Sequence, residues 1–178
     1  MLNGITLGIV MIVILLFASL ILTLLINILL VPLFKTPKKV LSEIVDLMTL
    51  RKEDHIVDLG SGDGEILFKA YRISNCKCTG YDISPIMLIL AKTKRIVNFP
   101  LSKDFNFEAK DIFKAELSNF TKAYCYLDKK SIKILEPKLK QFVKEGKEIY
   151  SYRYEIEGIK NKKKIILQNG ESLYIYKG

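Results

Sequence analysis

The residues with the clearest chemical character form a short glycine loop, Asp58-Leu59-Gly60-Ser61-Gly62-Asp63-Gly64, at the end of the apolar run 55–60. Glycines let a backbone turn tightly and come close to a bound molecule. In sheets that alternate with helices, ligands bind outside the carboxyl ends of the strands, which is where we expect this loop to lie. A dinucleotide fingerprint is excluded because Glu65 stands where G-x-G-x-x-G needs its last glycine. A P-loop is excluded because no G-K-[ST] follows.

The charge of this loop narrows the class of ligand. Asp58 and Asp63 put negative charge where a pyrophosphate would lie, and like charges repel. A ligand that is cationic and lacks phosphate fits better. S-adenosylmethionine has both properties, since its sulfonium and α-ammonium groups are positive and its adenosine carries no phosphate. We therefore predict this cofactor. We predict no metal site, because the thiols of Cys76 and Cys78 lack the further cysteine or histidine ligands of a zinc site.

Two further acids are expected at the same edge of the sheet. Asp82 ends the second predicted strand, 22 residues after Gly60, at the position where an acid accepts the ribose hydroxyls. Asp111 ends the third predicted strand, where it can meet the adenine amino group. Alternatively, each acid only caps the next helix, which explains any one of them more readily than all three. The predicted cofactor-binding residues are Asp58, Gly60, Ser61, Gly62, Asp63, Asp82, Ile83, Asp111 and Ile112.

The elements that must position these residues alternate between strand and helix. The expected helices cover residues 37–48, 64–73, 84–97 and 137–145, with Thr36 as the hydroxyl cap of the first and Pro137 in the first turn of the last. The expected strands cover residues 55–60, 76–82, 105–111, 123–128, 147–156, 162–168 and 172–177. Asn169-Gly170 between the last two is a hairpin signal. This order predicts an α/β fold, a Rossmann-like and mostly parallel seven-stranded sheet with a terminal antiparallel hairpin.

The amino-terminal part of the chain has a different character. The chain has 178 residues and a net charge of +9, yet every charged side chain lies in residues 35–178. The apolar run 5–34 exceeds the ~20 residues that a spanning helix needs. A secretory signal is the competing interpretation, but its apolar core is usually ~7–15 residues long and follows a basic stretch. We predict a transmembrane anchor at residues 1–34 and one catalytic domain at residues 35–178.

The charges that follow the run predict an orientation and partners. Lys35, Lys38 and Lys39 come directly after it, and positively charged flanks stay in the cytoplasm. The domain is therefore expected to face the cytoplasm as part of a single-pass membrane protein. A basic domain fits an anionic lipid surface and also nucleic acid, but a membrane tether disfavours the latter. The expected partners are the bilayer, its anionic lipid and a membrane-protein substrate.

These motifs resemble those of the class I methyltransferases over about residues 36–178. VDLGSGDG (57–64) matches the first motif of that class, and Asp82 and Asp111 match its acids on the second and third strands. More narrowly, the chain resembles the small membrane-anchored protein-lysine methyltransferases whose mitochondrial members modify the ATP synthase c subunit and the adenine nucleotide translocase. The narrower resemblance is carried by the apolar helix and by VPLFKTPKKVLSEIVDLM, VDLGSGDGEIL, GYDISPIMLILAK and ILEPKLKQFVKEGKEIYSYRYEI. It implies S-adenosylmethionine-dependent methyl transfer to lysine.

The residues after the fourth predicted strand bear on the acceptor. The chain has Tyr126-Leu127-Asp128-Lys129 there, where many amide-nitrogen and adenine methyltransferases have an Asn-Pro-Pro-Tyr type motif, so a nucleobase amino group is disfavoured. A lysine amine must be neutral to accept a methyl group, and its reference pKa is ~10.4. Asp128 is a candidate catalytic residue that orients the amine and accepts its proton, and Tyr126 is a candidate to line the pocket. Alternatively, Asp128 is a helix cap and Tyr126 a packed aromatic residue.

Two other functions stay open from the sequence alone. One is methyl transfer to a lipid or a small hydrophobic acceptor at the membrane surface. The other is a non-catalytic membrane-bound nucleoside sensor or scaffold. An acidic patch around the acceptor opening would favour lysine as the substrate, whereas an apolar channel facing the bilayer would favour lipid.

Overall fold

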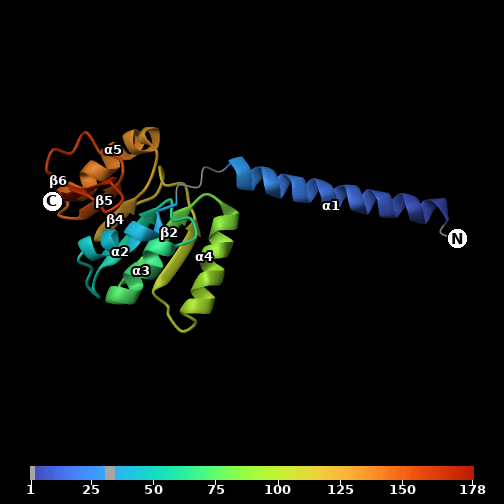
Figure 1. The fold of residues 1–178 in the computed structure, drawn as a ribbon, viewed down its shortest axis with the longest axis horizontal. Helices are drawn as coiled ribbons and strands as arrows, with labels where there is room; N and C mark the ends of the chain where they lie inside the picture. The colour runs from blue at the N-terminus through green and yellow to red at the C-terminus, as the bar shows by residue number, and fades with distance from the viewer. Residues whose placement is uncertain (1–2, 31–34) are drawn as a thin grey trace. The chain divides into compact units, whose positions relative to one another are not determined.

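The structure is a computed structural model in which residues 3–30 and 35–178 are described. By its internal contacts the chain divides into two compact units, Met1–Leu33 and Phe34–Gly178 (Figure 1). The first unit contains helix α1, Gly4–Leu30, a helix of 27 residues without acidic or basic side chains. Its window Thr6–Thr23 has a mean hydropathy of 2.7 and is 0% buried. By length and composition α1 qualifies as a membrane span, a test that a signal sequence also passes. Residues 31–34 of the predicted anchor lie outside the described residues.

The second unit is built on a seven-stranded sheet with the order β3-β2-β1-β4-β5-β7-β6. Its strands are β1 His55–Leu59, β2 Lys77–Asp82, β3 Phe105–Ala109, β4 Lys122–Cys125, β5 Glu148–Tyr152, β6 Lys162–Ile166 and β7 Ser172–Lys177. Neighbouring strands from β3 to β5 pair in parallel, and β7 pairs antiparallel with both β5 and β6. The predicted Rossmann-like sheet with its terminal hairpin is confirmed.

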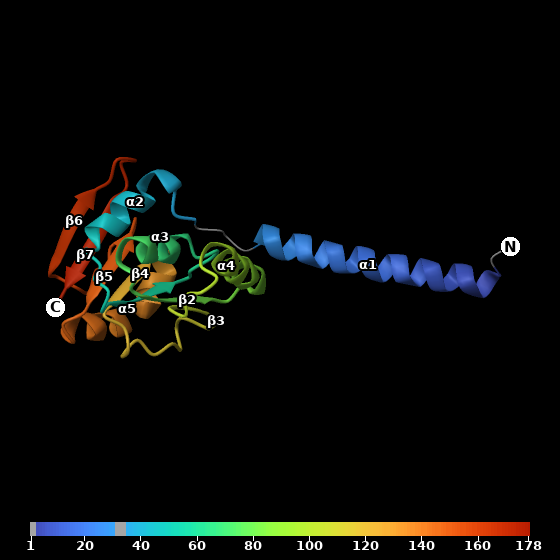
Figure 2. The ribbon, with the colours of Figure 1, turned by 90° about the horizontal axis from the view of Figure 1, so that it is seen from below.

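Four helices cover the two faces of this sheet: α2 Lys38–Leu47, α3 Glu65–Ser74, α4 Pro85–Asn98 and α5 Lys129–Lys144. Figure 2 shows α2, α3 and α4 on one face and α5 on the other. The buried side chains divide in the same way, because those of α2, α3 and α4 form one core cluster and those of α5 another. In the described residues 153–161, between β5 and β6, the chain forms no helix. Ile156 and Ile159 of this segment are buried and pack into the core on the α5 side.

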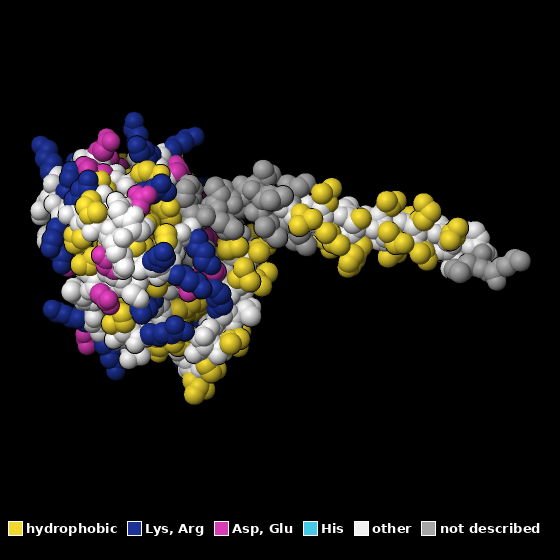
Figure 3. Space-filling view, in the orientation of Figure 1, with side chains coloured by type: hydrophobic (Ala, Val, Ile, Leu, Met, Phe, Trp, Pro, Cys, Tyr) yellow, Lys and Arg dark blue, Asp and Glu magenta, His cyan; other side chains and the backbone are white. Residues whose placement is uncertain are grey.

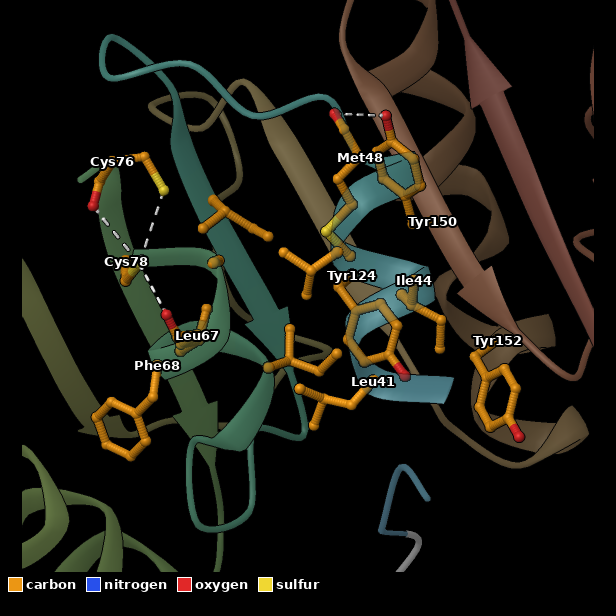
Figure 4. Close-up of a cluster of buried hydrophobic side chains, with 14 of the residues drawn as sticks. Leu41, Ile44, Met48, Leu67, Phe68, Cys76, Cys78, Tyr124, Tyr150 and Tyr152 are labelled. Atoms are coloured by element: carbon orange, nitrogen blue, oxygen red, sulfur yellow. Dashed lines mark hydrogen bonds between the residues drawn. The ribbon is translucent and has the colours of Figure 1, made fainter. Parts of the chain in front are cut away.

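The core on the α2 side contains polar atoms that pair with one another (Figure 4). The Tyr150 hydroxyl donates to the carbonyl oxygen of Met48 at 3.1 Å. The hydroxyls of Tyr124 and Thr36 lie 2.7 Å apart, both buried. Buried hydroxyls without partners are costly, so the Thr36–Tyr124 bond holds the chain just before α2 against β4. The Met48–Tyr150 bond holds the C-cap of α2 against β5.

Two predicted helix starts are wrong. Thr36 does not cap α2, since Pro37 occupies the N-cap position and no side chain caps the helix. The Thr36 hydroxyl pairs with Tyr124 instead. The predicted helix 137–145 begins earlier, because α5 starts at Lys129 and contains Pro137 in its interior. Pro137 is exposed, so the carbonyl oxygen that loses its partner lies where water can replace the bond.

Candidate cofactor and acceptor site

The glycine loop leaves β1 and turns back onto the end of β2. The backbone N–H groups of Gly60 and Ser61 both donate to the carbonyl oxygen of Tyr81 at 2.9 Å. Gly60 has a φ of +88° and Gly64, the N-cap of α3, a φ of +82°, a conformation that side chains with a Cβ rarely adopt. An added Cβ on Gly60 would also approach Leu127 Cδ2 to 3.1 Å. The glycines are therefore required for the turn itself.

Asp82 ties the glycine loop to the start of α4. Its Oδ2 accepts a hydrogen bond from the N–H of Gly62 at 2.7 Å, and its Oδ1 accepts one from the N–H of Ser84 at 2.8 Å. Each carboxylate oxygen has a second lone pair, which can accept a hydroxyl of the cofactor ribose. Ile83, the next residue, is 78% exposed. An exposed isoleucine beside this acid offers an apolar surface for a flat ring.

Ser61 lies between the loop and the sheet. Among the residues that the structure describes, its hydroxyl is the one buried side-chain N or O atom without a hydrogen-bond partner. It lies against Gly80 of β2, where an added Cβ would come within 2.6 Å of Ser61 Oγ and 2.7 Å of Phe107 Cδ1. Gly80 is thus needed so that the loop can pack down on β2.

Asp58, at the end of β1, is buried beneath the loop. Burial raises the pKa of its carboxyl group well above the ordinary value, and the nearby charges of Asp82 and Asp63 raise it further. Three acids of the predicted set therefore share one small region. A phosphate placed here would raise the pKa of Asp58 further, whereas a cationic ligand group would favour its charged form.

Asp63 is the centre of an ion-pair cluster at the outer side of the loop. Lys94 of α4 contacts its Oδ2 at 2.9 Å and Glu65 Oε1 at 2.5 Å, and Lys35 contacts the same Asp63 oxygen. Burial alone would raise the pKa of Asp63, but the hydrogen bonds from Lys35 and Lys94 lower it below the ordinary value. The contacts of Lys35 and Lys94 with Asp63 were not predicted from the sequence, because no local pattern marks which lysines reach the loop.

Asp111 and Ile112 lie in the turn after β3. Asp111 Oδ1 accepts a hydrogen bond from the N–H of Phe113 at 2.9 Å. Ile112 is half-buried and packs against the α5-side core. The structure thus gathers Asp58, Asp63 and Asp82 around the glycine loop, whereas it shows Asp111 holding its own turn. Contact of Asp111 and Ile112 with adenine stays a prediction.

The two acceptor-side candidates occupy structural positions. Asp128 is the N-cap of α5, where it accepts hydrogen bonds from the Ser131 N–H at 3.0 Å and the Ser131 hydroxyl at 2.6 Å. These bonds lower the pKa of Asp128, which makes it a weak proton acceptor. Tyr126 packs edge-on against Tyr152, with ring centroids 4.8 Å apart. These contacts are those of the alternatives given in the sequence analysis, in which Asp128 is a helix cap and Tyr126 is a packed aromatic residue.

Arg153 is a residue on this side that sequence reasoning missed. It directly follows β5 and has a φ of +74°, a backbone conformation that costs about 1–3 kcal/mol and clusters at functional sites. Its guanidinium contacts Glu171 at 3.2 Å and the Tyr126 hydroxyl at 3.3 Å. A positive φ at a non-glycine residue has no sequence signature. Arg153 connects the ends of β4, β5 and β7.

The residues at the carboxyl ends of the strands fit S-adenosylmethionine. The glycine cradle permits close backbone approach, Asp82 has acceptor capacity for ribose, and the three gathered acids suit a cation. When bound, the cofactor supplies an electrophilic methyl group on its sulfonium. The protein then has to align the acceptor in line with that group and exclude water. This fold and site define a class I S-adenosylmethionine-dependent methyltransferase.

Comparisons with known proteins identify the family. The model of the ANTKMT methyltransferase domain matches residues 58–163, more than half of the chain, and the chain belongs to that family. The predicted resemblance to protein-lysine methyltransferases is confirmed. A protein-lysine N-methyltransferase of Saccharolobus islandicus (strain REY15A) is 27% identical over 150 residues, 82% of this chain and 92% of that protein.

Solved structures agree on fold and cofactor. An RNA methyltransferase from Salinibacter ruber in complex with S-adenosyl-L-homocysteine has a TM-score of 0.73 and 26% identity, covering 80% of this chain and 92% of that one. A ribosomal protein L11 methylase from Lactobacillus delbrueckii subsp. bulgaricus, at a TM-score of 0.66 and 15% identity, covers 81% and 80% and shares the fold. The predicted cofactor, S-adenosylmethionine, is confirmed.

Proposed function

We propose that this enzyme methylates a lysine side chain of a membrane protein at the cytoplasmic surface of the bilayer that its own helix α1 spans. The observation that carries the membrane part is α1 itself, 27 residues without a charged side chain joined to a methyltransferase domain. Lysine as the acceptor is supported by membership of the ANTKMT family and by the relative named a protein-lysine N-methyltransferase.

The charges next to α1 support the cytoplasmic orientation. Lys35, Lys38 and Lys39 are the first charged residues of the chain, and basic flanks are retained on the cytoplasmic side. The chain between α1 and α2 is short, since α1 ends at Leu30 and α2 begins at Lys38. Seven linking residues reach at most about 25 Å when fully extended. A domain tethered in this way meets acceptors on the same membrane at a raised effective concentration.

A cleft on the acceptor side supports lysine over lipid. It has a volume of about 860 Å³ and lies between the first turns of α5, the segment after β5 and strand β7. Arg153, which lines it, directly follows β5, and Lys129 comes four residues after the end of β4, so part of the cleft lies at the edge of the sheet that carries the glycine loop. Among its described lining residues, four carboxylates outnumber the three basic side chains, those of Lys129, Lys133 and Arg153, so the lining favours a lysine ammonium by one net charge and is unsuited to an acyl chain. These carboxylates belong to Glu136, Glu155, Glu157 and Glu171.

The acceptor amine has to lose a proton before it can displace the methyl group. Burial among apolar and aromatic side chains lowers the pKa of a lysine. Tyr154 and Tyr174, which line the cleft together with Arg153, supply such rings. The low pKa of Asp128 leaves desolvation and proton loss to water as the route that these residues support. The proposal therefore assigns no catalytic base.

The anchor provides the test. A truncated form that begins at Lys35 is expected to bind S-adenosylhomocysteine with unchanged affinity but to methylate its membrane acceptor about 10²-fold more slowly. An unrelated spanning helix placed before Lys35 should restore most of the rate. Equal rates for the truncated and full-length forms would show that proximity is not what α1 provides. Label found in lipid or in RNA, with none in protein, would replace the lysine proposal.

A further inference from the structure

Helix α4 has apolar side chains on two faces. Leu88 and Ala91 are buried against the core. The opposite face exposes Ile89 (64%), Leu90 (43%), Ile96 (60%) and Val97 (73%), and Leu101 in the turn that follows is 93% exposed. Figure 3 shows hydrophobic side chains along the edge of the domain where α4 lies in Figure 1. We call these five exposed residues the α4 patch.

The spacing of the α4 patch makes it one surface. Ile89 and Ile96 are seven residues apart, as are Leu90 and Val97, and residues at that spacing lie on the same side of a helix two turns apart. The surface helix of a soluble domain typically has a polar outer face. A contiguous exposed apolar patch marks an interaction site for a protein or a membrane.

The charges around the α4 patch decide between these partners. From Pro85 to Lys103 the chain has four basic residues and no acidic one. Lys92 and Lys103 are exposed beside the patch. An apolar stripe flanked by lysines is typical of helices that lie in the interface of an anionic membrane. Two copies of the chain would instead bring these lysines against one another.

We propose that the α4 patch docks on the bilayer, with its apolar side chains in the boundary between headgroups and acyl chains and with Lys92 and Lys103 on lipid phosphates. This inference rests on the proposed function in one respect, since a spanning α1 keeps the domain near the lipid. It adds a second membrane contact that α1 alone does not provide. Because α4 begins two residues after Ile83 and its Lys94 contacts Asp63, docking fixes the orientation of the cofactor edge relative to the membrane.

The test uses a reporter that the chain lacks. There is no tryptophan in the sequence, so Leu101→Trp places a single tryptophan in the patch, which is excited at a wavelength that tyrosine does not absorb. The matched control is Ile134→Trp, because Ile134 is 54% exposed on α5, which packs on the opposite face of the sheet (Figure 2). Both full-length variants are reconstituted in vesicles of phosphatidylcholine and phosphatidylglycerol with brominated acyl chains, which quench tryptophan on contact.

Strong quenching of Leu101→Trp with little quenching of Ile134→Trp is the expected result. Equal quenching of both, or of neither, overturns the proposal. A blue-shifted Leu101→Trp emission without bromine quenching would show that protein covers the patch, and this also overturns it. Quenching needs no acceptor, so docking and the proposed function can fail separately.

As a second readout, Ile96→Ser combined with Val97→Ser should slow methylation of the membrane acceptor about tenfold without changing S-adenosylhomocysteine affinity. Unchanged methylation by this variant also contradicts docking.

Discussion

The Asp82→Ala substitution tests the cofactor site most sharply. The Asp82 carboxylate accepts backbone hydrogen bonds at 2.7 and 2.8 Å and is predicted to accept two ribose hydroxyls. A hydrogen bond to a charged group contributes about 1.5–3 kcal/mol, so losing two costs at least about 3 kcal/mol. Because each 1.4 kcal/mol is about tenfold in affinity, Asp82→Ala should bind S-adenosylhomocysteine at least about a hundredfold more weakly. Calorimetric titration measures this.

Because Asp82 also holds the loop, a double-mutant cycle is needed to separate the two effects. An S-adenosylhomocysteine analogue without the ribose hydroxyls should bind wild type much more weakly than the parent ligand does. The Asp82→Ala variant should bind the analogue and S-adenosylhomocysteine with about the same affinity, because it has lost the carboxylate that the hydroxyls contact. The matched control is Asp111→Ala, whose predicted partner is adenine, so it should weaken both ligands alike. If removing the hydroxyls costs Asp82→Ala as much affinity as it costs wild type, Asp82 does not bind the ribose.

Three further predictions concern stability and the acceptor side. Gly80→Ala should lower the free energy of unfolding by about 1–3 kcal/mol through overpacking against Ser61, and an unchanged urea midpoint would contradict this. Since the folded pKa of Asp58 is raised, the native state keeps a proton that the unfolded chain releases, so stability should fall as pH rises above ~3.9. Asp58→Asn should remove that part of the slope, and an identical slope in the variant would refute it. Asp128→Ala should cost about 1 kcal/mol of stability by loss of the cap, whereas Asp128→Ser should keep both cap and methyl transfer. A large rate loss in Asp128→Ser would instead assign a proton-accepting role.

The sheet was predictable because its signals are local. The glycine loop after the apolar run 55–60, the acids that end or follow the strands and the Asn169-Gly170 turn each specify a boundary within a few residues. Pro137 led to a wrong predicted start of α5 because it is also a local signal, since proline is usual in the first turn of a helix. It was outweighed by Ile132, Leu135 and Leu139, whose buried spacing extends α5 toward Asp128. Propensity is a weak prior that packing overrides.

The parts of the site that could not be predicted depend on contacts between distant residues. Thr36 pairs with Tyr124, 88 positions away, and Lys35 reaches Asp63 across 28 positions. No local pattern marks either pair. The exposed face of α4 could not be predicted either, because which of its apolar residues face outward depends on how the helix packs on the sheet. Arg153 was recognised as a candidate site residue only from its backbone conformation in the structure.

The central proposal is that this enzyme transfers methyl groups to lysine on a protein of the membrane that α1 spans. The most direct measurement incubates native membranes that lack the enzyme with radioactive S-adenosylmethionine and purified full-length protein, then identifies the labelled species. The account predicts label in a membrane-protein band, recovered as methyl-lysine after hydrolysis and lost with the Asp82→Ala variant. Label confined to lipid, or no label that depends on the enzyme, would contradict it.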